Sequence, residues 1–300
     1  MLFPPPLSEG SKIGIVSPAS VVDSIKIEQG IALLKEWGFE VVLGEHTFSE
    51  HYQFAGTPEQ RLSDLQRFID DDSIDAIICA RGGYGVVQFI DDVDFTRLIQ
   101  RPKWIVGYSD VTVLHCALQK MQIASLHAPM LKGIEDISHE SRKYFLNILT
   151  GESAHYAVIP NIINRLGKAK GKLIGGNIAL LHNQIGTSTD FDTEGKILFL
   201  EDVYEPLYNI DRMMRHLDRA GKLKNLAGLM IGDISRIKSE TPPFDKNAEQ
   251  IILDLVKKYN YPVCFGFPCG HEDQNYPLIC GAEAHLEVSE HHVSLKFGYT

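Results

Sequence analysis

The first 130 residues alternate between short apolar stretches and segments with helical periodicity. The periodic segments include residues 25–37 and a helix opened by the capping box Thr57-Pro-Glu-Gln60 and ending at Ile69. The apolar stretches are typical of buried strands and cover residues 12–17, 39–43, 75–80, 104–107 and 123–126. Helices between short apolar strands predict an α/β domain with a parallel sheet and right-handed crossovers.

Three segments in this part follow the ends of predicted strands. They contain Pro18, the loop Arg81-Gly-Gly-Tyr-Gly85 and Ser109. In open α/β sheets, ligands bind beyond the carboxyl ends of the strands. We therefore expect the three segments to converge on one crevice.

Ser109 stands where the apolar stretch Trp104-Ile-Val is followed by a glycine and a helix that starts near Asp110. A serine at such a turn exposes its hydroxyl, and the N–H of the next residue points into the same space. This arrangement presents a nucleophile beside half of an oxyanion hole. The simpler interpretation is a turn at which Ser109 or Asp110 caps the helix. Gly-Tyr-Ser-Asp also lacks the trailing glycine of a Gly-x-Ser-x-Gly elbow.

The glycines of the 81–85 loop allow backbone N–H groups to approach a ligand closely. One interpretation is phosphate binding, although the loop has neither a Gly-x-Gly-x-x-Gly pattern nor the lysine of a P-loop. A second is that one glycine N–H completes the oxyanion hole facing Ser109. A tight turn with glycines for steric reasons remains the plain alternative.

The second half of the chain predicts a separate, mixed domain. We place an N-terminal α/β domain at residues 1–135, a helix and connector at 136–170, and a C-terminal domain at 171–300. The C-terminal domain is expected to contain an apolar helix after Asn177, two further helices at residues 208–220 and 247–259, and a hairpin formed by residues 285–288 and 293–297. Its other predicted strands cover residues 196–200, 226–231 and 263–265.

Two residues of this second domain are candidates for general acid–base chemistry. Glu201 directly follows an apolar strand, so we expect it half buried at the strand end, where it could orient a histidine. His271 lies in a loop rich in glycine, proline and polar residues and is a candidate general base. Asp202 competes with Glu201, and His127, directly after the fifth strand, competes with His271. Solvent-exposed side chains without a catalytic role are the plain alternative.

Composition excludes several classes of function. The net charge of -10, with no basic block, argues against a nucleic-acid partner, and no apolar run approaches the roughly 20 residues of a membrane span. The N-terminus shows no signal-peptide pattern. The odd number of cysteines, without Cys-x-x-Cys spacing, predicts reduced core thiols and a cytoplasmic protein. No metal-ligand spacing is present, so we expect no metal.

Five blocks in order along the chain resemble the LD-carboxypeptidase family of serine peptidases. They are Ala80-Arg-Gly-Gly-Tyr-Gly85, Gly107-Tyr-Ser-Asp110, Gly175-Gly-Asn177, Leu200-Glu-Asp202 with Ile210-Asp-Arg212, and Gly270-His271 before Pro277-Leu278. The resemblance implies a flavodoxin-like N-terminal domain and a smaller C-terminal domain of the swivelling β/α type, with the active site between them. It implies a homodimer as a possible assembly.

The resemblance further implies a Ser-His-Glu triad, with Ser109 as nucleophile, His271 as general base and Glu201 as its orienting acid. The N–H groups of Gly83 and Asp110 would form the oxyanion hole, and no cofactor is implied. The expected reaction removes the terminal D-alanine from murein tetrapeptides in peptidoglycan recycling.

Two other functions remain open. A branch of the family resembles the microcin C immunity peptidases, which cleave peptidyl-aminoacyl nucleotide analogues, and Pro277-Leu-Ile-Cys-Gly281 departs from the usual pattern near His271. From another class, the chain could be a non-catalytic protein that binds a nucleotide or a sugar at the 81–85 loop.

A carboxypeptidase must also recognise a free terminal carboxylate. Arg81 is a candidate because a guanidinium matches a carboxylate in a bidentate way. The alternative is a structural ion pair of Arg81 with Asp110 or Asp75. Tyr84 and Asn177, which lie in the sequence blocks 80–85 and 175–177 that resemble the family, are further candidates for substrate binding.

Overall fold

A computed structural model describes residues 1–298 and divides the chain into two compact units. The first unit contains Met1–Ser153 and Asp273–Gly281, and the second contains Ala154–Glu272 and the described residues from 282 onward. These boundaries differ from the expected ones at residues 135 and 170. The segment Asp273–Gly281, expected in the C-terminal domain, returns to the first unit because β11 (Leu278–Cys280) pairs with β5 (Ser125–His127).

The first unit is built on a six-stranded sheet in the order β11-β5-β4-β3-β1-β2. The remaining strands are β1 (Lys12–Val16), β2 (Glu40–Leu43), β3 (Ala76–Cys79) and β4 (Trp104–Gly107). All neighbours pair in parallel except β11, which is antiparallel to β5. The order 2-1-3-4-5 is that of flavodoxin-like folds. The predicted parallel α/β domain is therefore confirmed.

In the described part of this unit, five α-helices follow strands, and all but the short α3 lie where a helix was predicted. They are α1 (Ile25–Glu36), α2 (Pro58–Asp70), α3 (Thr96–Gln100), α4 (Thr112–Lys120) and α5 (His139–Leu149). The capping box of α2 is confirmed, because Gln60 N donates to Thr57 Oγ1 at 3.3 Å and Thr57 N donates to Gln60 Oε1 at 2.9 Å. Phe68 of α2 packs directly on Gly14 of β1. A Cβ there would lie 2.6 Å from the Phe68 ring, so only glycine allows this close approach.

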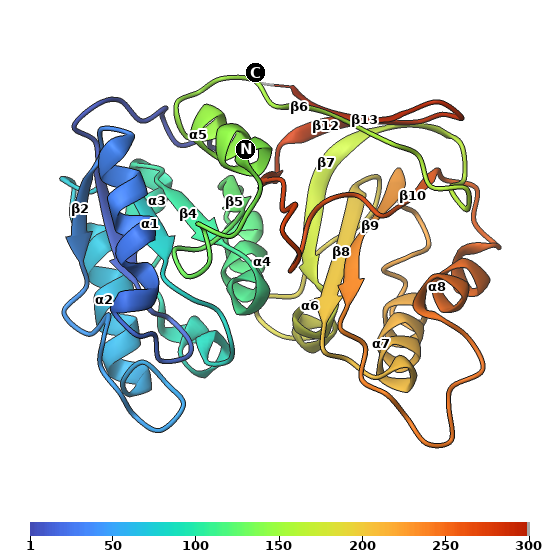
Figure 1. The fold of residues 1–300 in the computed structure, drawn as a ribbon, viewed down its shortest axis with the longest axis horizontal. Coiled ribbons are helices and arrows are strands. Elements are labelled where there is room, and N and C mark those ends of the chain that lie inside the picture. Colours follow the sequence, from blue (N-terminus) through green and yellow to red (C-terminus); the bar gives the residue numbers. More distant parts are fainter. Residues whose placement is uncertain (299–300) are drawn as a thin grey trace. The chain divides into compact units, whose positions relative to one another are not determined.

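The second unit has a seven-stranded sheet in the order β10-β9-β8-β7-β12-β13-β6 (Figure 1). The strands are β6 (His155–Val158), β7 (Gly167–Asn177), β8 (Ile197–Val203), β9 (Gly228–Ser235), β10 (Val263–Phe265), β12 (Glu283–Val288) and β13 (Val293–Gly298). The strands β7 to β10 run parallel, whereas β7, β12, β13 and β6 pair antiparallel. The predicted second, mixed α/β part and its β12–β13 hairpin are confirmed.

Three helices accompany the parallel part of this sheet: α6 (Ile178–Gln184), α7 (Leu207–Arg219) and α8 (Ala248–Val256). In Figure 1, α7 lies beside both α6 and α8, below and to the right of the strands. The expectation of a helix and connector at residues 136–170 was wrong in part, because β6 and the first residues of β7 lie within that range. The strands β6 and β7 pair with the antiparallel part of the sheet, in which one face of each strand is exposed to solvent. Their polar side chains therefore weaken the apolar pattern expected of a strand.

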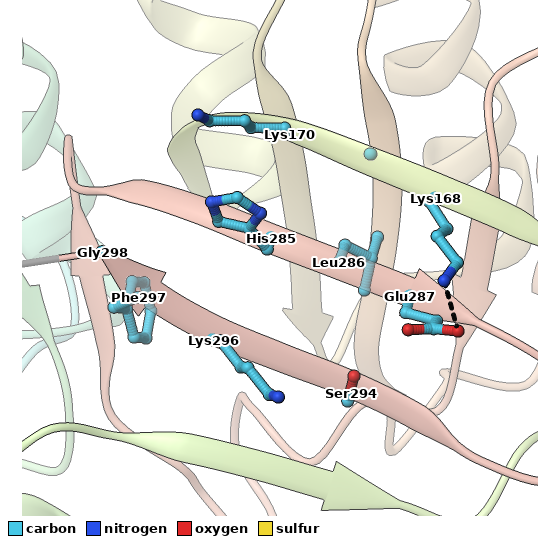
Figure 2. A pocket seen from close by; sticks show the side chains of 10 residues that line it. Lys168, Lys170, His285, Leu286, Glu287, Ser294, Lys296, Phe297 and Gly298 are labelled. Carbon is cyan, nitrogen blue, oxygen red and sulfur yellow. Dashed lines mark ion pairs between the residues drawn. The ribbon is translucent and has the colours of Figure 1, made fainter.

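The outward face of β7, β12 and β13 carries a pocket lined by charged side chains (Figure 2). Lys168 pairs across the strands with Glu287 at 3.0 Å, and Lys170 pairs with Glu283 at 2.9 Å. Lys296 and His285 lie on the same face. Such cross-strand pairs of opposite charge favour the antiparallel register. None of the predicted site residues lines this pocket.

All five cysteines are free and buried, as the expectation of core thiols requires. Within residues 1–298, none of the helices has both the length and the apolar character that crossing a bilayer demands.

Candidate active site

Ser109 occupies a strained turn at the carboxyl end of β4. Its φ of 62° lies in the left-handed region, which non-glycine residues adopt rarely and often at functional sites. The turn continues as a short 3-10 helix, Ser109–Val111, before α4 begins at Thr112, so the helix expected near Asp110 opens with a tighter turn. The side chain of Ser109 is half-buried. The local geometry is therefore that of a strand-to-helix elbow.

The three loops expected to meet at the sheet edge do converge. A Cβ on Gly82 would lie 3.2 Å from Ser109 Oγ, and one on Gly83 would lie 2.1 Å from Ser20 Oγ. Gly83 also has a φ of 121°, which favours glycine. Ser20 N donates to Gly82 O at 3.4 Å, which joins the segment after Pro18 to the glycine loop. The expected convergence of the three segments is confirmed within the first unit.

The buried side chains of Asp110 and Arg61 pack against the glycine loop and its neighbours. Asp110 is fully buried, and its Oδ2 accepts a hydrogen bond from Val86 N at 2.8 Å. Burial raises the pKa of Asp110 to about 6, against the opposing effects of the Val86 N–H and the charge of Arg61. Arg61 is buried as well, and its Nη1 donates to Pro18 O at 3.2 Å. The sequence analysis did not identify Arg61. A charged residue on the apolar, inward side of α2 is the signal that could have identified it.

The two substrate-binding candidates of this unit occupy different environments. Arg81 Nη1 donates to Val21 O at 2.6 Å, and within residues 1–298 no ion pair joins it to Asp110 or Asp75. The alternative of a structural ion pair for Arg81 is therefore wrong. Tyr84 is 49% exposed, with its ring 6.0 Å from that of Phe54.

The histidines near this edge are part of the core. His115 is fully buried, with Nδ1 2.8 Å from Ser125 Oγ and Nε2 2.9 Å from Gly107 O. Burial lowers the pKa of His115 to about 4, which keeps the ring neutral. His127 is the last residue of β5 and fully buried, with its ring 5.9 Å from Tyr108 and 6.1 Å from His115. A fully buried ring is poorly placed to act on a substrate.

The second unit brings Glu201 and His271 together. His271 Nδ1 lies 2.7 Å from Glu201 Oε2, and Glu201 is fully buried. A carboxylate at Nδ1 requires that this nitrogen carry the proton, which leaves the lone pair of the neutral ring on Nε2. Burial alone would lower the pKa of His271, but the charge and hydrogen bond of Glu201 outweigh it, and the pKa is raised. Glu201 thus fixes the orientation and the tautomer of the His271 ring.

Glu201 lies inside β8 and not at its end, which corrects the expectation of a half-buried residue. The strand continues through Val203 because Asp202 and Val203 still pair with Ile234 and Ser235 of β9, after a register shift between Leu200 and Asp202. Glu201 Oε1 is buried with no hydrogen-bond partner within residues 1–298. Among the described residues, His271 is therefore the hydrogen-bond partner of the Glu201 carboxylate, and it contacts one of the two oxygens.

Asp202 has a different role from its neighbour. Its Oδ1 accepts from Asn177 Nδ2 at 3.0 Å and from Val203 N at 2.8 Å, and its Oδ2 accepts from Ala179 N at 3.0 Å. Asn177 is buried and caps α6 through Leu180 N. Asp202 and Asn177 thus fasten the start of α6 to β8, and Glu201 is the carboxylate that contacts His271.

Asp233 is a further carboxylate near His271 that sequence reasoning missed. It follows the apolar run of β9 much as Glu201 follows that of β8, which is the signal that could have identified it. A Cβ on Gly270 would lie 3.0 Å from Asp233 Cβ and 3.3 Å from Glu201 Cβ, so the glycine lets the histidine loop pass close to both strands. Glu272 N donates to Asp233 Oδ2 at 3.4 Å.

Asp233→Asn is expected to stabilise the protein at alkaline pH relative to the wild type. Burial, with the charges of Glu272 and Glu201, raises the pKa of Asp233 to about 7, although the Glu272 N–H and His271 oppose this. The unfolded carboxyl ionises near pH 4, so the wild type loses stability as pH rises from about 4 to about 7. We expect a relative gain of about 1–2 kcal/mol, reduced because the carboxyl is partly solvated.

Urea unfolding of both proteins at about pH 5 and pH 8 measures this gain. An equal difference in the free energy of unfolding at the two pH values would contradict it.

The predicted site residues thus fall into two sets. Ser109, Gly83, Asp110, Arg81 and Tyr84 belong to the first unit, and Asn177, Glu201 and His271 to the second. Within residues 1–298, no three or more His, Cys, Asp or Glu side chains are grouped so that they could hold a metal ion.

Comparisons with known proteins match both parts of the chain. Residues 13–128 match the LD-carboxypeptidase N-terminal domain, and residues 170–286 match the LD-carboxypeptidase C-terminal domain. A Bacillus subtilis protein called "Probable murein peptide carboxypeptidase" is 33% identical over 293 residues, which covers 96% of this chain and 92% of that protein.

Solved structures share the fold along nearly the whole chain. The muramoyltetrapeptide carboxypeptidase from Oxalobacter formigenes superposes with a TM-score of 0.88 at 29% identity, covering 96% of this chain and 99% of that one. The microcin C7 self-immunity protein MccF superposes with a TM-score of 0.89 at 21% identity, covering 100% and 99%, and shows the fold alone. With both domains matched, this chain belongs to the LD-carboxypeptidase family and is an LD-carboxypeptidase.

Proposed function

We propose that this enzyme is a serine peptidase that releases the terminal D-alanine of murein tetrapeptides, with Ser109, His271 and Glu201 as its triad. The observation that carries the proposal is the 2.7 Å contact between His271 Nδ1 and the buried Glu201 Oε2. In a nucleophilic triad, a buried carboxylate holds the histidine through Nδ1, as Glu201 does here. The strained turn at Ser109 supports the choice of nucleophile.

The reaction proceeds by acyl transfer in two steps. His271 Nε2 takes the proton from Ser109 Oγ as the oxygen attacks the carbonyl carbon of the scissile amide. The protonated ring then gives this proton to the departing amine, and D-alanine leaves. Water attacks the acyl-enzyme by the same route, and His271 again moves the proton. Glu201 holds the ring orientation and stabilises the imidazolium that forms twice.

The negative oxygen of each tetrahedral intermediate needs preorganised donors. The N–H groups of Gly83 and Asp110 are the proposed pair, one in the glycine loop and one directly after the nucleophile. The positive φ at Gly83 favours glycine at this position. The side chain of Asp110 is held by the hydrogen bond that it accepts from Val86 N. Losing one such donor typically costs roughly 2.7–4 kcal/mol of transition-state stabilisation.

The proposed setting is peptidoglycan recycling in the cytoplasm, where short murein peptides are the substrates. The names of the relatives from Bacillus subtilis and Oxalobacter formigenes, which refer to murein peptide and muramoyltetrapeptide, support this substrate class.

Incubating the purified protein with L-Ala-γ-D-Glu-meso-diaminopimelyl-D-Ala is expected to release D-alanine, measured by chiral chromatography or with a D-amino acid oxidase assay. The control is the same peptide ending in L-alanine, which the enzyme should leave intact. Absence of D-alanine release, together with cleavage of a peptidyl-adenylate amide, would replace this proposal with the microcin-type activity.

A further inference from the structure

The strands β8 and β9 end side by side on two residues with unusual backbone conformations. Val203 is paired with Ser235 at the last register position, and Tyr204 and Arg236 follow them. Their φ values are 64° and 51°, both in the left-handed region. Tyr204 N donates to Ser235 O at 3.1 Å, which ties the two ends together. Left-handed non-glycine residues need support from their surroundings and cluster at ligand-binding positions.

The side chain of Arg236 connects this edge to the histidine loop. Its Nη1 donates to Tyr204 Oη at 3.0 Å, and the guanidinium carbon lies 5.6 Å from the centre of the Tyr204 ring. Its Nη2 donates to the carbonyl oxygen of His271 at 3.5 Å, and its Nε lies 3.6 Å from Glu272 Oε1. Arg236 is thus a cation held against the main chain of the proposed general base.

The proposed reaction calls for a carboxylate-binding group in this region. His271 protonates the amine of the departing D-alanine, and the carboxylate of that amino acid is only two covalent bonds from the same nitrogen. A group that recognises the free carboxylate must therefore lie within a few ångströms of the substrate atom that His271 protonates. A planar guanidinium with two parallel N–H donors is well suited to such a carboxylate.

We propose that Arg236 binds the terminal carboxylate of the substrate and so restricts the enzyme to peptides with a free C-terminus. This inference rests on the proposed function, since it assigns a residue to the recognition of D-alanine. It replaces Arg81 in that role. Arg81 Nη1 donates to Val21 O in the first unit, whereas Arg236 Nη2 donates to the main chain of His271 in the second.

The side chain of Glu272 marks the position of the bound carboxylate. It forms the ion pair with Arg236 at 3.6 Å, and the two side chains are 50% and 44% exposed for Arg236 and Glu272, respectively. An ion pair this exposed contributes little to stability and is easily exchanged. The carboxylate of D-alanine can therefore take the place of Glu272, while Tyr204 Oη keeps the guanidinium in position.

The test compares two substrates that differ only at the C-terminus. One is the tetrapeptide ending in D-alanine, and the other ends in D-alaninamide, from which D-alaninamide would be released. Wild-type kcat/KM is expected to favour the free acid. Arg236→Gln is expected to lower kcat/KM for the acid roughly tenfold to a hundredfold, the effect typical of a lost charge-assisted hydrogen bond, and to leave the amide nearly unchanged.

Two controls make the outcome decisive. Arg215→Gln removes another half-exposed arginine, 57% exposed and paired with Asp211 at 2.7 Å, and should change neither value. Arg81→Gln tests the competing candidate. Equal losses on acid and amide in Arg236→Gln, or loss of discrimination in Arg81→Gln instead, would overturn the assignment of Arg236. Failure of the wild type to release D-alanine would overturn the proposed function itself, and with it this inference.

Discussion

Replacing Ser109 with alanine is expected to lower kcat for D-alanine release by at least about 10⁴-fold, because no other group can form the acyl-enzyme. The substitution removes only the hydroxyl group of a half-buried side chain, and it leaves the turn between β4 and α4 in place. Alanine at a φ of 62° costs about as much as serine does, so the melting temperature should change little. Peptide binding, measured by calorimetry with the uncleaved tetrapeptide, should persist.

A fluorophosphonate probe gives an independent readout, because it reacts with an activated serine and needs no knowledge of the natural substrate. Labelling is expected at Ser109 in the wild type and should be absent in Ser109→Ala. Ser63→Ala serves as the matched control, since Ser63 lies on the exposed side of α2 and its Oγ donates only to Gln60 O among the described residues. Near-normal turnover in Ser109→Ala would exclude Ser109 as the nucleophile.

Much of the first unit could be predicted because its signals are local. The alternation of apolar strands and amphipathic helices, with the box at Thr57 and Gln60, depends on neighbours within a few residues. The convergence of the Pro18, 81–85 and Ser109 segments followed from the rule that parallel strands share a carboxyl edge. What could not be predicted is β11, because its pairing joins residues about 150 positions apart.

The second unit shows where local patterns mislead. The start of β7 reads Gly-Lys-Ala-Lys-Gly-Lys, in which Ala169 is the inward-facing side chain and the lysines face solvent, so the apolar signal of a strand is weak. The position of Glu201 was misjudged for the opposite reason. A carboxylate usually ends an apolar strand, but here the partner His271 offsets the cost of burying it within β8.

Tyr204 and Arg236, which lie near the proposed base, were missed because their signals are not in the sequence. Nothing in the residue types of Tyr204 and Arg236 indicates a left-handed backbone, which follows from how β8 and β9 end together. The expectation that Glu201 could orient a histidine nevertheless agrees with the 2.7 Å contact, because a carboxylate at a strand mouth and a loop histidine at the same sheet edge are complementary.

Replacing Glu201 with glutamine is expected to reduce kcat by about 10³- to 10⁴-fold while the protein still folds. An amide can present its N–H to Nδ1 and so favour the wrong tautomer of His271, and it cannot stabilise the imidazolium. The variant also shifts the pH profile. Glu201 raises the pKa of His271 against the effect of burial, so without its charge that pKa falls. Since only the neutral ring accepts a proton, the acid limb of kcat/KM should move to lower pH.

Asp202→Asn is the matched control for Glu201→Gln, because the two carboxylates are neighbours in β8 and only Glu201 contacts His271 directly. Asp202 accepts bonds from Asn177 and Ala179, so its loss should weaken the start of α6 and lower the free energy of unfolding by about 1–3 kcal/mol below pH 7. Burial raises the pKa of Asp202 to about 7, so the ionised wild type is less stable above that pH and the difference should shrink there. Its kcat should fall less than tenfold, and its acid limb should move to lower pH by less than that of Glu201→Gln, because the charge of Asp202 raises the pKa of His271 less than Glu201 does. A larger loss of kcat in Asp202→Asn than in Glu201→Gln would reverse the roles of the two residues, because the charge that matters for His271 would then act through Asp202.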